Sequence, residues 1–257
     1  MKKIKNLINV FILVSLFVVM GSPSPSALAG SDANAPNLGT AASFVALASS
    51  TLTNTGPGVY IGDVGTSPGT SITGFPPGTV INGSIYMGGS VPDQAQIDAL
   101  AAYNDLDGQT CNVNLTGQDL GGMTLNQDVY CFDTSAQLTG NIVLDAQGNS
   151  NAVWVFQTGS TLTTASDSSV ILINGGNPLN VFWQIGSSTT LGTYTRFQGN
   201  IIAFESITSD TGASLVGRAI ALNGAITLNT NETPYPIANV QILNIYLPLM
   251  VDPSTTP

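Results

Sequence analysis

The chain has 257 residues, of which only 8% are charged and none is histidine, and its formal net charge is −10. So acidic a chain repels nucleic acid and anionic lipid surfaces. General acid–base and nucleophilic catalysis draw on His, Lys, Cys and paired carboxylates, which are scarce here. We therefore expect no nucleic-acid partner, no catalytic residue, no cofactor and no metal site.

Residues 1–29 have the pattern of a secretory signal peptide. Three lysines precede an apolar stretch from 7 to 20, and Ala27-Leu28-Ala29 is a small-residue cleavage site. A membrane anchor is the alternative, but the apolar stretch is short for a span, which needs about 20 residues. We expect cleavage after Ala29 and a secreted protein that does not associate with membranes. Of the basic residues only Arg196 and Arg218 then remain against 15 acidic ones, a net charge of −13.

Residues 30–236 are predicted to form one domain built mainly of β-strands. β-Branched residues alternate with polar ones, and pairs such as Pro57-Gly58 and Pro77-Gly78 interrupt the runs as turn formers do. Within this domain Thr51-Leu52-Thr53 is an early strand whose leucine must point inward to reach a core, so that both threonines point to solvent.

One segment, residues 92–106, predicts a helix. Proline and aspartate open it, alanines fill it, and Gly108 follows it, all of which are helix start and stop signals. Its apolar stripe is expected to pack on the wall of the β domain. The residues that recur at spacings of three and four are Ile97, Leu100, Ala101 and Asn104.

The two cysteines, Cys111 and Cys131, are predicted to form a disulfide. An exported chain meets oxidising conditions, and the number of cysteines is even. Closing a loop of about 20 residues adds on the order of 3 kcal/mol in the chain-entropy model. Metal binding by two thiols without histidine is the weaker interpretation.

Four stretches in the second half repeat one pattern, an apolar tetrad closed by an amide or acid and followed by a Thr/Ser/Gly-rich strand. The closing residues stand at 157, 184, 205 and 223, which gives steps of 27, 21 and 18 residues. A fixed pattern with a drifting period is typical of a solenoid whose corners carry insertions. We therefore expect the tetrads to stack in this register.

Alternation also decides which residues of the repeat strands face outward. Leu162, Leu191, Ile207 and Ile226 are predicted to point into the core. The residues next to them then point to solvent. Together with Thr51 and Thr53 they lie on five strands that form one face. These neighbours are Thr161, Thr163, Thr190, Ser206, Thr208, Ala225 and Thr227.

The face so predicted is almost free of charge and regular in two directions. Strands lie about 4.7–4.9 Å apart, and outward side chains along a strand about 6.6 Å apart. Threonine is stiff about χ1, so each methyl and hydroxyl has a defined place. Such a face can order water, and its natural partner is a crystalline surface. Threonine also simply suits exposed strands, but five strands in one register are harder to explain that way.

Several distinctive motifs occur in order along the chain. They are Asn37-Leu38-Gly39-Thr40-Ala41-Ala42-Ser43-Phe44, Gly62-Asp63-Val64-Gly65-Thr66-Ser67-Pro68-Gly69, Gly74-Phe75-Pro76-Pro77-Gly78, Ala102-Tyr103-Asn104-Asp105, Leu120-Gly121-Gly122-Met123-Thr124-Leu125, Leu144-Asp145-Ala146-Gln147-Gly148 and Phe182-Trp183-Gln184-Ile185-Gly186. Through these motifs the chain resembles, from about residue 37 to 231, the ice-binding-protein-like family, formerly a domain of unknown function.

The resemblance implies a discontinuous right-handed β-solenoid of triangular cross-section with a long helix alongside. It also implies adsorption to an ice crystal through one flat face that often carries Thr-Ala/Gly-x-Thr/Asn motifs. Three segments are similar to that motif, starting at residues 164, 191 and 211, and each departs from it at one or two positions. They add Thr164, Thr193, Thr211 and Ser214 to the predicted ice-binding residues.

Two other functions compete with a secreted, monomeric ice-binding protein. A solenoid surface could bind a glycan or another protein as an adhesion module, but the aromatic residues expected outside, Tyr60 and Tyr194, are isolated. A polysaccharide lyase or hydrolase would need clustered carboxylates or basic residues in a groove. Residues 237–257, broken by prolines and polar residues, are expected to form an extra strand or cap and a loose tail.

Overall fold

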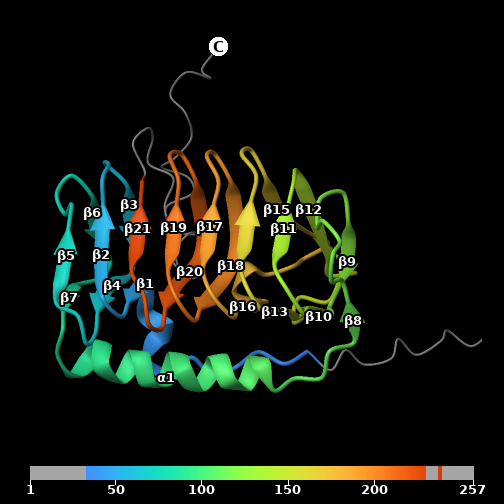
Figure 1. Cartoon of the computed structure of the whole chain (residues 1–257), viewed down its shortest axis with the longest axis horizontal. Helices are drawn as coiled ribbons and strands as arrows, with labels where there is room; N and C mark the ends of the chain where they lie inside the picture. Colours follow the sequence, from blue (N-terminus) through green and yellow to red (C-terminus); the bar gives the residue numbers. More distant parts are fainter. Residues whose placement is uncertain (1–32, 230–236, 239–257) are drawn as a thin grey trace, which may run out of the picture. The chain divides into compact units, whose positions relative to one another are not determined.

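The computed structural model describes residues 33–229 and 237–238. The predicted leader, residues 1–29, and the C-terminal segment beyond residue 238 lie outside the described residues. The described chain forms a β-solenoid with an α-helix beside it (Figure 1). Its strands make two sheets in which every pairing is parallel, one of seven strands and one of fifteen.

The larger sheet is bent into two faces, and the smaller sheet is the third. Face 1 consists of β8 (Val113–Asn114), β10 (Asp128–Phe132), β13 (Trp154–Thr158), β16 (Val181–Ile185), β1 (Phe44–Ala48), β4 (Asp63–Thr66) and β7 (Ile85–Met87). Face 2 consists of β9 (Thr124–Asn126), β12 (Asn141–Asp145), β15 (Ser169–Ile173), β22 (Ile237–Ala238), β3 (Val59–Ile61) and β6 (Thr79–Ile81). Face 3 consists of β11 (Ala136–Leu138), β14 (Leu162–Thr164), β17 (Thr189–Leu191), β19 (Ile207–Ser209), β21 (Ile226–Leu228), β2 (Thr51–Asn54) and β5 (Ser71–Thr73).

Two long strands, β18 (Arg196–Ala203) and β20 (Ser214–Ala221), belong to both halves of the bent sheet. The first half of β18 pairs with β15 of face 2, and its second half pairs with β16 of face 1. The bend falls at paired glycines, Gly199 and Gly217, which have φ of 118° and 150°. A Cβ on Gly217 would lie 2.0 Å from the carbonyl oxygen of Gly199. Only glycine fits this corner, because the backbones of two coils meet there.

The order of coils in space differs from the order in the chain. Along face 3 the strands follow β11-β14-β17-β19-β21-β2-β5, so the first coils of the chain stack beyond the last ones (Figure 1). We call this junction the seam; it consists of the pairings β20–β1 and β21–β2, with β22 between β20 and β3. The solenoid is therefore discontinuous, as the resemblance implies.

The helix α1 (Ser90–Asp107) packs against face 1 and the 3-10 helix η1 (Gly39–Ser43), but not with the predicted stripe. Ile97 and Leu100 are 62% and 45% exposed. The buried side chains are instead mostly alanines, which let the helix backbone approach the sheet closely. They are Pro92, Ala95, Ala99, Ala102 and Leu106. A second 3-10 helix, η2 (Pro178–Asn180), precedes β16.

This close approach gives a testable prediction. Replacing Ala99 by leucine is expected to destabilise the protein by about 1–3 kcal/mol, because the added methylenes enter a filled space. The matched control is Ala101→Leu on the exposed side of the same helix, which should change stability by no more than about 0.5 kcal/mol. Chemical denaturation measures both. Equal effects of the two substitutions would show that the alanine face is not tightly packed.

The tetrads stack as parallel strands, but their predicted register is only partly right. Gln157 pairs with Gln184, whereas Gln184 pairs with Ile202 and not with Glu205. The two glutamines share a neighbour, α1, and Gln157 Nε2 donates to the carbonyl oxygens of Leu106 and Gln109 at 2.7 Å each. Beyond them, burial of apolar residues sets the register, and Glu205 lies exposed at a corner.

The interior of the solenoid contains a column of aromatic rings. Tyr130, Phe156 and Trp183 stack with ring centroids 5.4 and 3.9 Å apart, and Phe197 lies 4.9 Å beyond Trp183. Near the end of the solenoid the predicted disulfide between Cys111 and Cys131 is confirmed. It ties the segment after α1 to β10.

Candidate functional site

Face 3 carries a line of threonines, one on each of six neighbouring strands. They stand in continuous register across the sheet, with Gln137 of β11 at one end. We call this line the threonine rank. In spatial order it consists of Thr163, Thr190, Thr208, Thr227, Thr53 and Thr73.

The rank points to solvent because its flanking residues fill the core. Leu162, Leu191, Ile207, Ile226 and Leu52 are all at most 1% exposed, which confirms the predicted alternation. Thr163 and Thr73 are exposed, and the other four members are partly exposed. Neighbouring members lie about 4.7–4.9 Å apart, the spacing of adjacent strands.

A second line of small residues runs beside the rank, two residues earlier on each coil. Its polar side chains form hydrogen bonds with one another and with the backbone. Thr161 Oγ1 donates to Ser135 Oγ at 2.9 Å, and Ser206 Oγ accepts from the backbone N–H of Ala225 at 3.2 Å. The line consists of Ser135, Thr161, Ser188, Ser206, Ala225, Thr51 and Ser71. Neither line contains a charged residue.

The four residues proposed from the resemblance alone do not lie in either line. Thr164 is 3% exposed and points inward, where its Oγ1 lies 2.7 Å from Thr195 Oγ1 and accepts from the backbone N–H of Gly192. The prediction that Thr164 faces outward is wrong, because it shares the inner side of β14 with Leu162. Thr193 and Thr211 lie in turns after face 3, and Ser214 begins β20.

Five positions of the two lines were not predicted: Ser71, Thr73, Ser135, Gln137 and Ser188. Ser71-Ile72-Thr73 repeats Ser206-Ile207-Thr208 residue for residue, so this sequence signal was available. Thr73 Oγ1 donates to Thr53 Oγ1 at 3.4 Å, which continues the rank to the edge strand.

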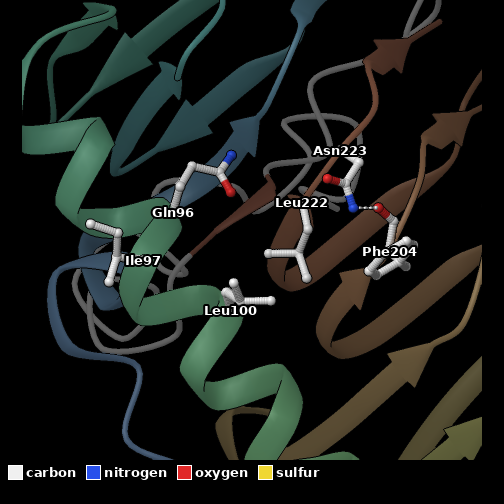
Figure 2. Close-up of a pocket in the computed structure, with 6 residues that line it drawn as sticks. All are labelled: Gln96, Ile97, Leu100, Phe204, Leu222 and Asn223. Carbon is white, nitrogen blue, oxygen red and sulfur yellow. Dashed lines mark hydrogen bonds between the residues drawn. The ribbon is translucent and has the colours of Figure 1, made fainter.

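A small apolar groove lies between α1 and the corner that leads into face 3 (Figure 2). Its volume is about 400 Å³, and its lining residues are Gln96, Ile97, Leu100, Phe204, Leu222 and Asn223. Asn223 Nδ2 donates to the carbonyl oxygen of Phe204 at 2.9 Å. None of these side chains titrates, so the groove offers no acid, base or nucleophile.

A smaller polar hollow at the β11 end of face 3 contains the carboxylate of Asp119. Burial acts to raise the pKa of Asp119, but hydrogen bonds from the hydroxyl and backbone of Thr139 and from the backbone of Gly121 outweigh it and lower the pKa. This carboxylate therefore stays charged and holds a turn. Among the described residues no group of three or more His, Cys, Asp and Glu side chains could hold a metal ion.

Residues 46–233 match the Ice-binding-like family. An ice-binding protein of Nostoc sp. (strain HG1) is 55% identical over 196 residues, which are 76% of this chain and 72% of that protein. The crystal structure of an ice-binding protein from the Antarctic ascomycete Antarctomyces psychrotrophicus has a TM-score of 0.74 at 41% identity, covering 79% of this chain and 98% of that one.

A domain of ice-binding protein 1 from Shewanella frigidimarina has a TM-score of 0.72 at 29% identity, covering 80% of this chain and 98% of that domain. The two solved structures share the overall fold of this chain. A match of this extent shows membership, and the chain belongs to the Ice-binding-like family.

Proposed function

We propose that this protein adsorbs to ice through face 3, with the threonine rank and the line beside it as the contact surface. The observation that carries the proposal is the continuous register of six threonines across a sheet whose strands carry no charged residue. Its relatives are named for binding ice. Adsorption of this kind needs no catalysis.

The chemistry of the rank suits an ordered water lattice. Each threonine presents a methyl and a hydroxyl in a fixed rotamer, so water above the face meets a repeating pattern of apolar and hydrogen-bonding groups. A charge at the face would have to be desolvated on contact, which is costly. The absence of charge from both lines therefore favours contact with a neutral crystal surface over contact with an ion or a polyelectrolyte.

We further propose that the protein acts outside the cell as a monomer, because each copy presents a complete face and residues 1–29 have the signal-peptide pattern. Within the described residues no helix combines the length and apolarity needed to cross a membrane. The non-titrating lining of the groove supports a role without catalysis.

Microscopy of single ice crystals grown in the purified protein tests the proposal. We expect faceted crystals whose growth stops within a temperature gap below melting, and grains that stay small on annealing. Crystals that grow as rounded discs, as in buffer, at every protein concentration would contradict it. Binding to a glycan array together with rounded crystals would support the adhesion alternative instead.

A further inference from the structure

The threonine rank is assembled from two separate parts of the chain. Thr53 and Thr73 belong to coils that precede α1, whereas Thr163 to Thr227 belong to coils that follow it. The two parts meet in the rank where Thr227 pairs with Thr53, across the seam. A continuous rank therefore requires that the seam be closed.

A buried arginine links the two sides of the seam. Arg218 lies on β20 and is 5% exposed. Its Nε and Nη2 donate to the carbonyl oxygen of Ala42, just before β1, at 3.0 and 2.6 Å. Its Nη1 donates to Asn200 Oδ1 at 2.7 Å. The guanidinium thus donates three charge-assisted hydrogen bonds, and two of them reach the backbone across the seam.

The rest of this network anchors the arginine to the coils that follow α1. Asn200 is fully buried, and its Nδ2 donates to the carbonyl oxygens of Leu179 and Val181 at 2.9 and 3.0 Å. Burial lowers the pKa of Arg218 to about 10, so the guanidinium remains charged at neutral pH. A charge buried among neutral oxygens is costly unless hydrogen bonds compensate it, and three such bonds hold this guanidinium. Its position is therefore tightly specified.

We propose that Arg218 is a positioning residue for the ice-contacting face: it holds β1 and β2 against β20 and β21, so that the threonine rank is continuous across the seam. This inference rests on the proposed function. In a solenoid each coil is stabilised mainly by its neighbours, so the coils on one side of the seam can keep their structure when the other side shifts. Loss of the clamp displaces Thr53 and Thr73 relative to Thr227 before the remaining coils unfold.

The test compares Arg218→Met with Arg196→Met, the same substitution at an exposed arginine of β18. For Arg218→Met we expect thermal hysteresis to fall severalfold. Amide hydrogen exchange should accelerate in β1 and β2 but stay slow in β13, β14, β16 and β17. Arg196→Met should match the unchanged protein in both measurements.

A covalent link across the seam then separates positioning from general stability. Ala48 and Ala221 are paired in register on β1 and β20 and are both fully buried. Adjacent strands are about 4.7–4.9 Å apart, within the Cα range of a disulfide. A disulfide made by the substitutions Ala48→Cys and Ala221→Cys is expected to restore thermal hysteresis to Arg218→Met. If Arg218→Met does not fold by itself, hysteresis is measured in the variant that also carries this disulfide.

Full hysteresis in Arg218→Met would overturn the inference, as would a loss that the cross-seam disulfide does not restore, or exchange that accelerates equally in all coils. A different result would contradict the proposed function. If a lysine in the middle of the rank leaves ice shaping intact, face 3 is not the contact surface, whatever Arg218 does.

Discussion

Replacing Thr208 by lysine is expected to abolish ice shaping while the protein stays folded. Thr208 lies between Thr190 and Thr227 in the rank and is partly exposed. A lysine there adds length and a charge that must be desolvated at the crystal surface. A desolvation penalty of a few kcal/mol corresponds to a loss of at least about tenfold in affinity. An exposed substitution shifts stability by no more than about 0.5 kcal/mol.

A second variant and a control separate bulk from charge and one face from another. Thr163→Tyr tests bulk alone at the exposed end of the rank. Thr124→Lys places the same charge at an exposed threonine on β9 of face 2 and should keep full activity. Hysteresis, recrystallisation inhibition and melting temperature are measured for all three. Full activity in both rank variants would assign ice contact to another face, and loss of folding would show that these threonines are core residues.

Truncation of Trp183 to alanine is expected to have the largest effect on stability. The indole is fully buried between Phe156 and Phe197, and its Nε1 donates to the carbonyl oxygen of Gln198 at 3.1 Å. Removing it leaves a cavity and eliminates this hydrogen bond, with a cost of about 3–5 kcal/mol. Denaturant unfolding measures the change.

Phe204→Ala is the control for this truncation. Phe204 is an aromatic residue at a corner, 40% exposed, whose ring packs on Tyr103 with centroids 5.9 Å apart. It should lose much less stability than Trp183→Ala, because water can fill the space it leaves. A cost for Trp183→Ala no larger than for Phe204→Ala would show that the interior column adjusts to the loss of a ring.

Local alternation predicted the outward side of face 3 well, because a leucine or isoleucine between two threonines can satisfy its burial in only one way. The family motif, by contrast, misplaced Thr164, which takes the inner position that alternation after Leu162 gives it and has Thr195 as its partner. Alternation could not say which strands are neighbours. Nothing near Thr53 indicates that its partner is Thr227, since pairing across the seam depends on the whole fold.

The helix shows a different limit of sequence patterns. Ile97 and Leu100 recur at helical spacing and suggest the packed side, and the alanines look like simple helix formers. The structure shows the opposite for most of the helix: Ile97 and Leu100 are exposed, and three alanines are buried with Leu106 near the C-terminal end. The tertiary contact with face 1 determines which side of the helix is buried, and the spacing of the large apolar residues did not predict that side.

The seam also has a consequence for how the chain acquires its structure. The first strands to be synthesised, β1 and β2, obtain their partners β20 and β21 only when nearly all of the described chain exists; Thr55, just past β2, bonds Asn229 across 174 residues. Contacts of such long range are slow to form, and strands that wait for them expose unpaired edges. The first coils can pair early with β4 and β5, but their other edge stays unpaired until the last coil has been made.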